Sequence, residues 1–322
     1  MGWQGALIFL RQLMLPTSSS TQPDRATSVS PISSTKYPLL IALLVASLLV
    51  WIKPLISTFQ LALSNDGYTH TLLILPLSLA LMFYEREPVS SKLAASKWLG
   101  YGLLLGAVLL RFMSGLHTIG LTEIGLSLSM LGLVLWWVGT VVVCFGSAVF
   151  RSLLFPLCLL ILMVPLPERA VDTVREALQH QSAAATAFLF RTAGVPVARE
   201  DVYLSIPGLD IEVARECSSI RSSTMLVVTT LVLGHLFLVS WWRQVVLVVI
   251  SFLLSVAKNA VRIFVIAELG TRVDPGYLNG RLHRQGGFIF LGLAILVEIF
   301  FLWVLKRGEF RAQKSFPSTH CG

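Results

Sequence analysis

Three residues in separate stretches of the chain have side chains that could together perform acyl transfer. Cys217 lies in EVARECSSIRSSTMLVV, where charged residues give way to an apolar run. Arg262 lies in KNAVRIF and His283 lies in LHRQGG. A cysteine thiolate is a nucleophile, a histidine can accept and return the leaving-group proton, and a guanidinium can donate to an oxyanion. These residue types predict nucleophilic catalysis through a thioester.

Two more polar residues favour the same site. Arg221 follows Cys217 by four residues, which places both on one face of a helix. Its positive charge, together with the start of that helix, would favour the thiolate form of Cys217. Asn259 shares a helical face with Lys258 and Arg262 inside an apolar segment. Charged and polar side chains in such a segment usually face the interior of a bundle and mark a functional site.

Other interpretations of these residues stay open. Arg262 could extend toward the membrane surface or pair with Glu268, and a histidine in a charged loop is often simply solvated. We interpret Cys144 and Cys158 as packing residues. The four cysteines form no CxxC pair, so we expect neither a metal site nor a disulfide framework, and no cofactor.

The composition indicates a membrane protein. Of the 322 residues, 55% are hydrophobic and 13% are charged, against about 45–50% and about 25% in soluble domains. The formal net charge of +8 comes from basic residues spread along the chain. Because they form no basic stripe, we expect no nucleic-acid partner and interpret them as a signal of membrane topology.

Eight apolar segments are candidates for membrane spans, each of which needs about 20 residues. They are Pro38–Ile56, Thr69–Tyr84, Trp98–Met113, Gly125–Gly146, Ser152–Leu166, Ser218–Val239, Trp242–Leu269 and Gln285–Leu305. Lysine and arginine in the short loops favour both termini in the cytoplasm. Residues 1–37 would then form a disordered cytoplasmic tail, 38–305 the membrane domain and 306–322 a second cytoplasmic tail. Cys217, Arg262 and His283 would lie at the outer ends of their spans.

The sizeable outer segment, 168–216, has two predicted parts. Its first part carries apolar residues at helical spacing, which predicts an amphipathic helix lying on the membrane. These residues are Val171, Val174, Leu178, Ala185, Phe188 and Leu189. Two alternating runs then flank Pro207 and Gly208, which predicts a β-hairpin leading to Cys217. The expected fold is an all-α polytopic bundle of about eight transmembrane helices with this small extracytoplasmic helix and hairpin.

In their order along the chain, these motifs resemble the exosortase/archaeosortase family of membrane-embedded cysteine transpeptidases. The resemblance covers roughly 65–305 and departs from the usual family pattern at Thr71 and Ser219, where glycine is common. The motifs that carry it are DGYTH (Asp66–His70), MVPLPE, GVPVARE, LDIEVARECSSIRSS, KNAVRI and LHRQGG.

The resemblance implies that Cys217 is the nucleophile, Arg262 the oxyanion or substrate stabiliser and His283 the general acid and base. It implies supporting roles for Tyr68 and His70 in DGYTH. Substrates would be secreted proteins that end in a short motif, a transmembrane span and a basic tail. The acceptor would be a lipid or glycan at the surface of the cell inner membrane.

Two alternatives to a transpeptidase remain. The same cysteine could catalyse simple hydrolysis of the substrate. Alternatively, the intramembrane charges Lys258 and Arg262 could line a path through a transporter or an assembly factor for polysaccharide export. An inverted repeat or paired broken helices would support a transporter, and the sequence displays neither feature.

Overall fold

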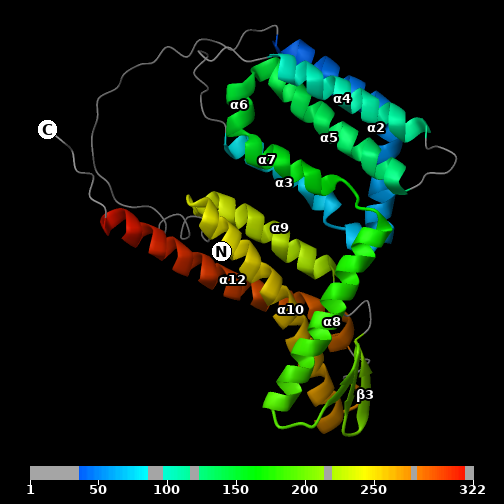
Figure 1. Cartoon of the computed structure of the whole chain (residues 1–322), viewed down its shortest axis with the longest axis vertical. Coiled ribbons are helices and arrows are strands. Elements are labelled where there is room, and N and C mark those ends of the chain that lie inside the picture. Colours follow the sequence, from blue (N-terminus) through cyan, green and yellow to red (C-terminus); the bar gives the residue numbers. More distant parts are fainter. Residues whose placement is uncertain (1–35, 86–96, 117–122, 214–219, 277–280, 316–322) are drawn as a thin grey trace, which may run out of the picture. The chain divides into compact units, whose positions relative to one another are not determined.

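The computed structural model describes residues 36–85, 97–116, 123–213, 220–276 and 281–315, and its elements are drawn in Figure 1. The helices of the first part are α2 (Lys36–Ser64), η1 (Asp66–Tyr68), α3 (Thr71–Tyr84), α4 (Lys97–Leu116), α5 (Glu123–Phe145), α6 (Ser147–Ser152), α7 (Leu154–Leu159) and η2 (Leu160–Met163). They are followed by α8 (Glu168–Thr192), the strands β1 (Ala198–Glu200), β2 (Tyr203–Ile206) and β3 (Leu209–Glu212), and then α9 (Ile220–Phe237), α10 (Trp241–Arg272) and α12 (Arg281–Ser315).

Seven described helices are long and apolar enough to cross a membrane, or eight if one bent pair counts as a single span. They correspond to α2, η1 with α3, α4, α5, α9, α10 and α12. Many of their large apolar side chains are exposed, as expected where a bundle faces lipid instead of water. The predicted all-α polytopic membrane fold is confirmed.

The expected span Ser152–Leu166 is divided into short pieces. Within it, the apolar stretch Leu154–Met163 forms α7 and η2, and the chain then bends by 95° into α8. Ten helical residues cover only about 15 Å, half of the hydrocarbon thickness. Pro165 and Pro167 follow η2, and proline removes a backbone donor and ends a helix. The two prolines therefore account for the bend, and α8 must continue this segment if it is to span.

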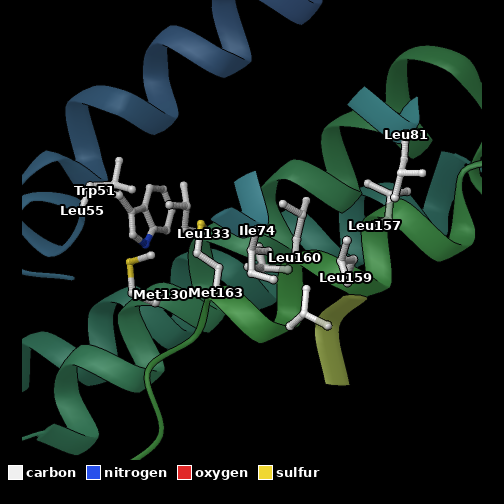
Figure 2. Packing of buried hydrophobic residues seen from close by; sticks show 12 residues of the cluster. Trp51, Leu55, Ile74, Leu81, Met130, Leu133, Leu157, Leu159, Leu160 and Met163 are labelled. Carbon is white, nitrogen blue, oxygen red and sulfur yellow. The ribbon is translucent and has the colours of Figure 1, made fainter. Parts of the chain in front are cut away.

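A core of apolar side chains joins α2, α3, α5, α7 and η2. Figure 2 shows Trp51 and Leu55 of α2 near Met130 and Leu133 of α5, with Ile74, Leu81 and residues of α7 and η2 beyond them. The indole Nε1 of Trp51 donates to the carbonyl oxygen of Ser129 at 2.7 Å. Because a buried indole N–H needs an acceptor, this bond fixes the position of α2 along α5.

Glycines let α4 and α5 approach closely. A Cβ atom on Gly100 of α4 would lie 2.6 Å from Val143 Cγ2 of α5, and one on Gly139 would lie 3.1 Å from the carbonyl oxygen of Gly100. Small residues at a helix interface in the membrane permit the close backbone packing that stabilises it. Gly102, two residues along α4, has no atom within 4 Å of such a Cβ.

We therefore expect Gly100→Val to lower the thermal unfolding midpoint of the detergent-solubilised protein. The added side chain would meet Val143 and force α4 away from α5, and overpacking of this kind costs about 1–3 kcal/mol. Gly102→Val adds the same atoms to the same helix in open space and should change the midpoint much less. Equal midpoints for the two variants would contradict the close α4–α5 contact.

The hairpin predicted around Pro207–Gly208 is confirmed and belongs to a three-stranded antiparallel sheet. Its order is β1-β2-β3, and Ile206 pairs with Leu209 across the two-residue turn. Gly208 has φ 85°, a backbone conformation that side chains disfavour. The sequence prediction missed β1, whose three residues are all exposed and carry no alternating pattern.

The helix α8 forms as predicted, but its buried face differs from the predicted apolar one. Val174 and Phe188 are exposed. The buried side chains are mostly small: Val171, Gln179, Ser182, Ala183, Thr186, Ala187 and Phe190. This face packs against α10 and the sheet, and small side chains allow that close approach. The predicted apolar side is largely left open by the protein, as expected of a side that faces lipid, whereas packing against protein selected the buried positions by size.

The helices α9, α10 and α12 contact one another pairwise and lie side by side in Figure 1. Near the start of α10, the carboxylate of Glu309 accepts hydrogen bonds from the backbone N–H groups of Ser240 at 2.7 Å and Val239 at 3.2 Å. The helix α12 thus continues beyond Leu305, where the predicted tail 306–322 begins, and secures the α9–α10 turn. The predicted tail 1–37 and residues 316–322 lie almost wholly outside the described residues.

Candidate active site

The packing of α10 against α12 places Arg262 beside the first turns of α12. Its Nη1 atom lies 4.0 Å from the position that a Cβ atom on Gly287 would occupy. Gly287 follows His283 by four residues, so both lie on one face of α12. The structure gives the backbone position of His283 and does not describe its side chain. Arg262 is therefore directed toward the helix turn that follows the predicted acid and base.

Cys217 lies outside the described residues, and the chain resumes at Ile220, the first residue of α9. Ile220 packs against the cluster formed by Ala62, Tyr68 and Val171. Two residues further on, the hydroxyl of Ser222 accepts a hydrogen bond from Nζ of Lys258. The segment that follows the predicted nucleophile is thus bound to α10 one turn from Arg262.

Arg221 forms an ion pair with Asp66 of η1. The Nη1–Oδ1 distance is 3.3 Å, and both side chains are exposed. An open depression of about 400 Å³ lies beside the pair, lined by Ala62, Leu63, Asp66, Thr69, Leu72, Leu73, Arg221 and Met225. The contribution of Arg221 to the reactivity of Cys217 remains a prediction, but the pair joins the start of α9 to the DGYTH segment.

Tyr68 anchors the same segment to the chain before α8, and His70 leads into the helix that follows it. Tyr68 is buried, and its hydroxyl donates to the carbonyl oxygen of Leu166 at 2.8 Å. The backbone carbonyl oxygen of His70 accepts hydrogen bonds from the N–H groups of Leu73 at 2.9 Å and Ile74 at 3.2 Å. These contacts fit supporting roles in which Tyr68 holds η1 in place and His70 joins η1 to α3.

Asn259 is fully buried in α10 beside Lys258. The alternative partner considered for Arg262, Glu268, instead forms an ion pair with Arg272 at 2.6 Å. One turn before Lys258 on α10, the hydroxyl of Ser255 is hydrogen-bonded to the hydroxyl of Ser223 on α9. The α9–α10 interface therefore carries two polar contacts, Lys258 with Ser222 and Ser255 with Ser223.

Sequence reasoning missed three partners in this region. Asp66 was not predicted to pair with Arg221, and Ser222 was not predicted to contact Lys258. Glu298, fully buried in α12, is hydrogen-bonded to Thr230 of α9. A charged residue within the last apolar run was a signal for Glu298, but a single sequence carries no signal for which residue it meets.

Two cysteines, Cys144 and Cys158, lie within the part of the chain that the structure describes. Cys144 is buried in α5, as expected for a packing residue. Cys158, also interpreted as a packing residue, is exposed on α7. Its position on a short apolar helix explains this, because one side of that helix faces away from the core. Neither residue has an arginine within four positions in the sequence, whereas Cys217 has Arg215 and Arg221.

The fold and this site define a multi-pass membrane protein in which charged and hydrogen-bonding residues gather at one end of three packed helices. The model of the transmembrane exosortase family matches residues 60–301, a range that includes Cys217, Arg262 and His283. The chain belongs to the transmembrane exosortase family. Neither a curated protein nor a solved structure matches it.

Proposed function

We propose that this chain is a cysteine transpeptidase that cleaves the C-terminal sorting tail of secreted proteins and transfers them to a surface acceptor. The observation that carries the proposal is the position of Arg262, whose guanidinium reaches the first turns of α12 near Gly287. His283 begins that helix, and Cys217 stands three residues before α9. Membership of the transmembrane exosortase family supports the same assignment.

In the proposed reaction, His283 accepts the thiol proton and the Cys217 thiolate attacks the carbonyl carbon of the scissile peptide bond. Arg262 donates hydrogen bonds to the oxyanion of the tetrahedral intermediate. The C–N bond then breaks, His283 gives its proton to the leaving amine, and a thioester remains on Cys217. A nucleophile of the acceptor loses its proton to His283, attacks the thioester and releases the thiolate.

The proposal places the site at the extracytoplasmic surface of the cell inner membrane, with both termini in the cytoplasm. This orientation rests on the distribution of lysine and arginine among the short loops. A substrate held by its own transmembrane span diffuses in two dimensions and presents its cleavage motif at one depth. The acceptor would be a lipid or glycan that is present in the same membrane.

The proposal is tested by isolating the acyl-enzyme. Membranes containing the protein and a substrate with a motif, a span and a basic tail are quenched in acid, and the products are analysed by mass spectrometry. We expect the N-terminal part of the substrate to be attached to Cys217 and to be released by hydroxylamine, which cleaves thioesters. An adduct on any other residue, or cleavage without an adduct in a Cys217→Ala variant, would contradict the proposal.

The C-terminus of the released product separates transfer from hydrolysis. A transpeptidase leaves an added mass from the acceptor on the new C-terminus, whereas a hydrolase leaves a free carboxylate. We expect the added mass, because partial exclusion of water from the proposed site would favour the acceptor over water.

A further inference from the structure

Lys258 is a buried cation for which the proposed reaction has no use. Its side chain is 7% exposed, and its ammonium donates to the hydroxyl of Ser222. Within the part of the chain that the structure describes, no Asp or Glu forms an ion pair with it. Arg262 lies one turn away on the same helix and is close enough to repel it.

Keeping an ammonium in this position is costly. Removing a charged group from water costs several kcal/mol even after relaxation of the protein, and a single hydroxyl offsets little of that cost. Two like charges separated by about 6 Å along a helix add repulsion. An anion held between Lys258 and Arg262 would offset the desolvation cost of the ammonium by pairing with it. The same anion would also reduce the repulsion between the two cations.

Helix packing alone does not require this charge. One turn along the same interface, Ser223 and Ser255 join α9 to α10 through two neutral hydroxyls, both buried. A neutral side chain at 258 could make an equivalent contact with Ser222. The ammonium therefore supplies something that the neighbouring contact lacks, which is positive charge near the start of α9. The positive end of the dipole of that helix adds to it.

We propose that Lys258, Arg262 and Ser222 form an anion-binding site that accepts a carboxylate or an oxyanion of the peptide substrate. The inference deepens the proposed function and rests on it, because Ser222 follows Cys217 by five residues. Lys258 reinforces Arg262 from one turn deeper along α10, so that negative charge arriving near Cys217 meets two cations.

The test compares Lys258→Met with Lys53→Met, which removes an exposed lysine from α2. Three quantities are measured: the thermal unfolding midpoint in detergent, the rate of substrate cleavage, and the ratio of Cys217 alkylation rates with iodoacetate and iodoacetamide. The ratio isolates the preference for an anion, because a change in the exposure of the thiol affects both reagents alike.

For Lys258→Met we expect an unchanged or raised midpoint, because an apolar side chain replaces a buried charge without a desolvation cost. We expect cleavage to fall about tenfold or more, the effect of about 1.4 kcal/mol, and the alkylation ratio to fall toward that of a neutral site. Lys53→Met should leave all three quantities near wild type.

Two outcomes would overturn the inference. Cleavage within twofold of wild type would show that the charge is not used, and a lowered midpoint with an unchanged alkylation ratio would assign Lys258 a structural role only. Neither outcome touches the proposed function, which fails separately if Cys217→Ala retains cleavage.

Discussion

Replacing Cys217 with alanine should abolish processing of the tailed substrate, with a loss of at least about 10³-fold in rate. The thioester requires the sulfur atom, and neither Arg262 nor His283 can substitute as a nucleophile in the proposed sequence of steps. The measurement is a pulse-chase of the substrate in cells, in which the uncleaved form is separated from the processed form by gel electrophoresis.

Cys158→Ala is the matched control, because Cys158 is an exposed cysteine on the apolar helix α7. We expect processing at the wild-type rate in that variant. Equal amounts of both variants in the membrane fraction show that the loss arises from chemistry and not from folding. Continued processing by Cys217→Ala would remove the transpeptidase assignment.

The spans were predictable because the membrane imposes a local requirement on the sequence. A helix surrounded by hydrocarbon needs about 20 apolar residues in succession, and segments such as Gly125–Gly146 meet it without reference to the rest of the chain. The predicted span at Ser152–Leu166 met the same test of composition. Its interruption arises from Pro165 and Pro167, which limit the helix to the pieces α7 and η2.

The packed face of α8 was not predictable from hydrophobicity because its neighbours decide it. The exposed Phe188 is more hydrophobic than the buried Ser182 and Thr186. The buried positions form the side that meets α10, where a large side chain would hold the helices apart. The size of a side chain on α8 becomes informative only when it is known that this side packs against α10.

In the candidate site too, the sequence predicted which residue types matter but not which residues they contact. Charges inside an apolar segment marked Arg262 as a candidate site residue from the sequence, and the structure directs it toward Gly287. The ion pair between Arg221 and Asp66 joins residues 155 positions apart. No spacing rule relates such residues, since the contact exists only after η1 and the start of α9 have been brought together by the fold.

The contacts of α9 explain how one helix can hold the site together. At its start, Arg221 reaches η1 and Ser222 reaches Lys258 of α10. Further along, Thr230 reaches Glu298 of α12. Because these bonds act at separate depths, α9 is fixed in rotation and in register against both partners. The position of Ile220, at which the described chain resumes after Cys217, is therefore fixed in the bundle.

Arg262→Lys should reduce cleavage by about 10²–10³-fold, even though the charge is kept, because this is the typical loss when an oxyanion donor is removed. A guanidinium presents several N–H groups in a rigid planar fork, whereas the ammonium of lysine is a compact point charge at the end of a shorter side chain. The guanidinium of Arg262 extends to within 4.0 Å of the Cβ position at Gly287. A lysine anchored at the same backbone position would not reproduce that fork beside α12.

Arg272→Lys is the control, since Arg272 lies on the same helix in an exposed ion pair with Glu268. Exposed pairs of this kind contribute about 0–1 kcal/mol, so its rate and stability should stay near wild type. Single-turnover cleavage measures the chemical step, and formation of the acyl-enzyme on Cys217 shows whether the block precedes the thioester. Near-normal single-turnover cleavage by Arg262→Lys would mean that charge alone suffices, and the oxyanion role would then have to be reassigned to another donor.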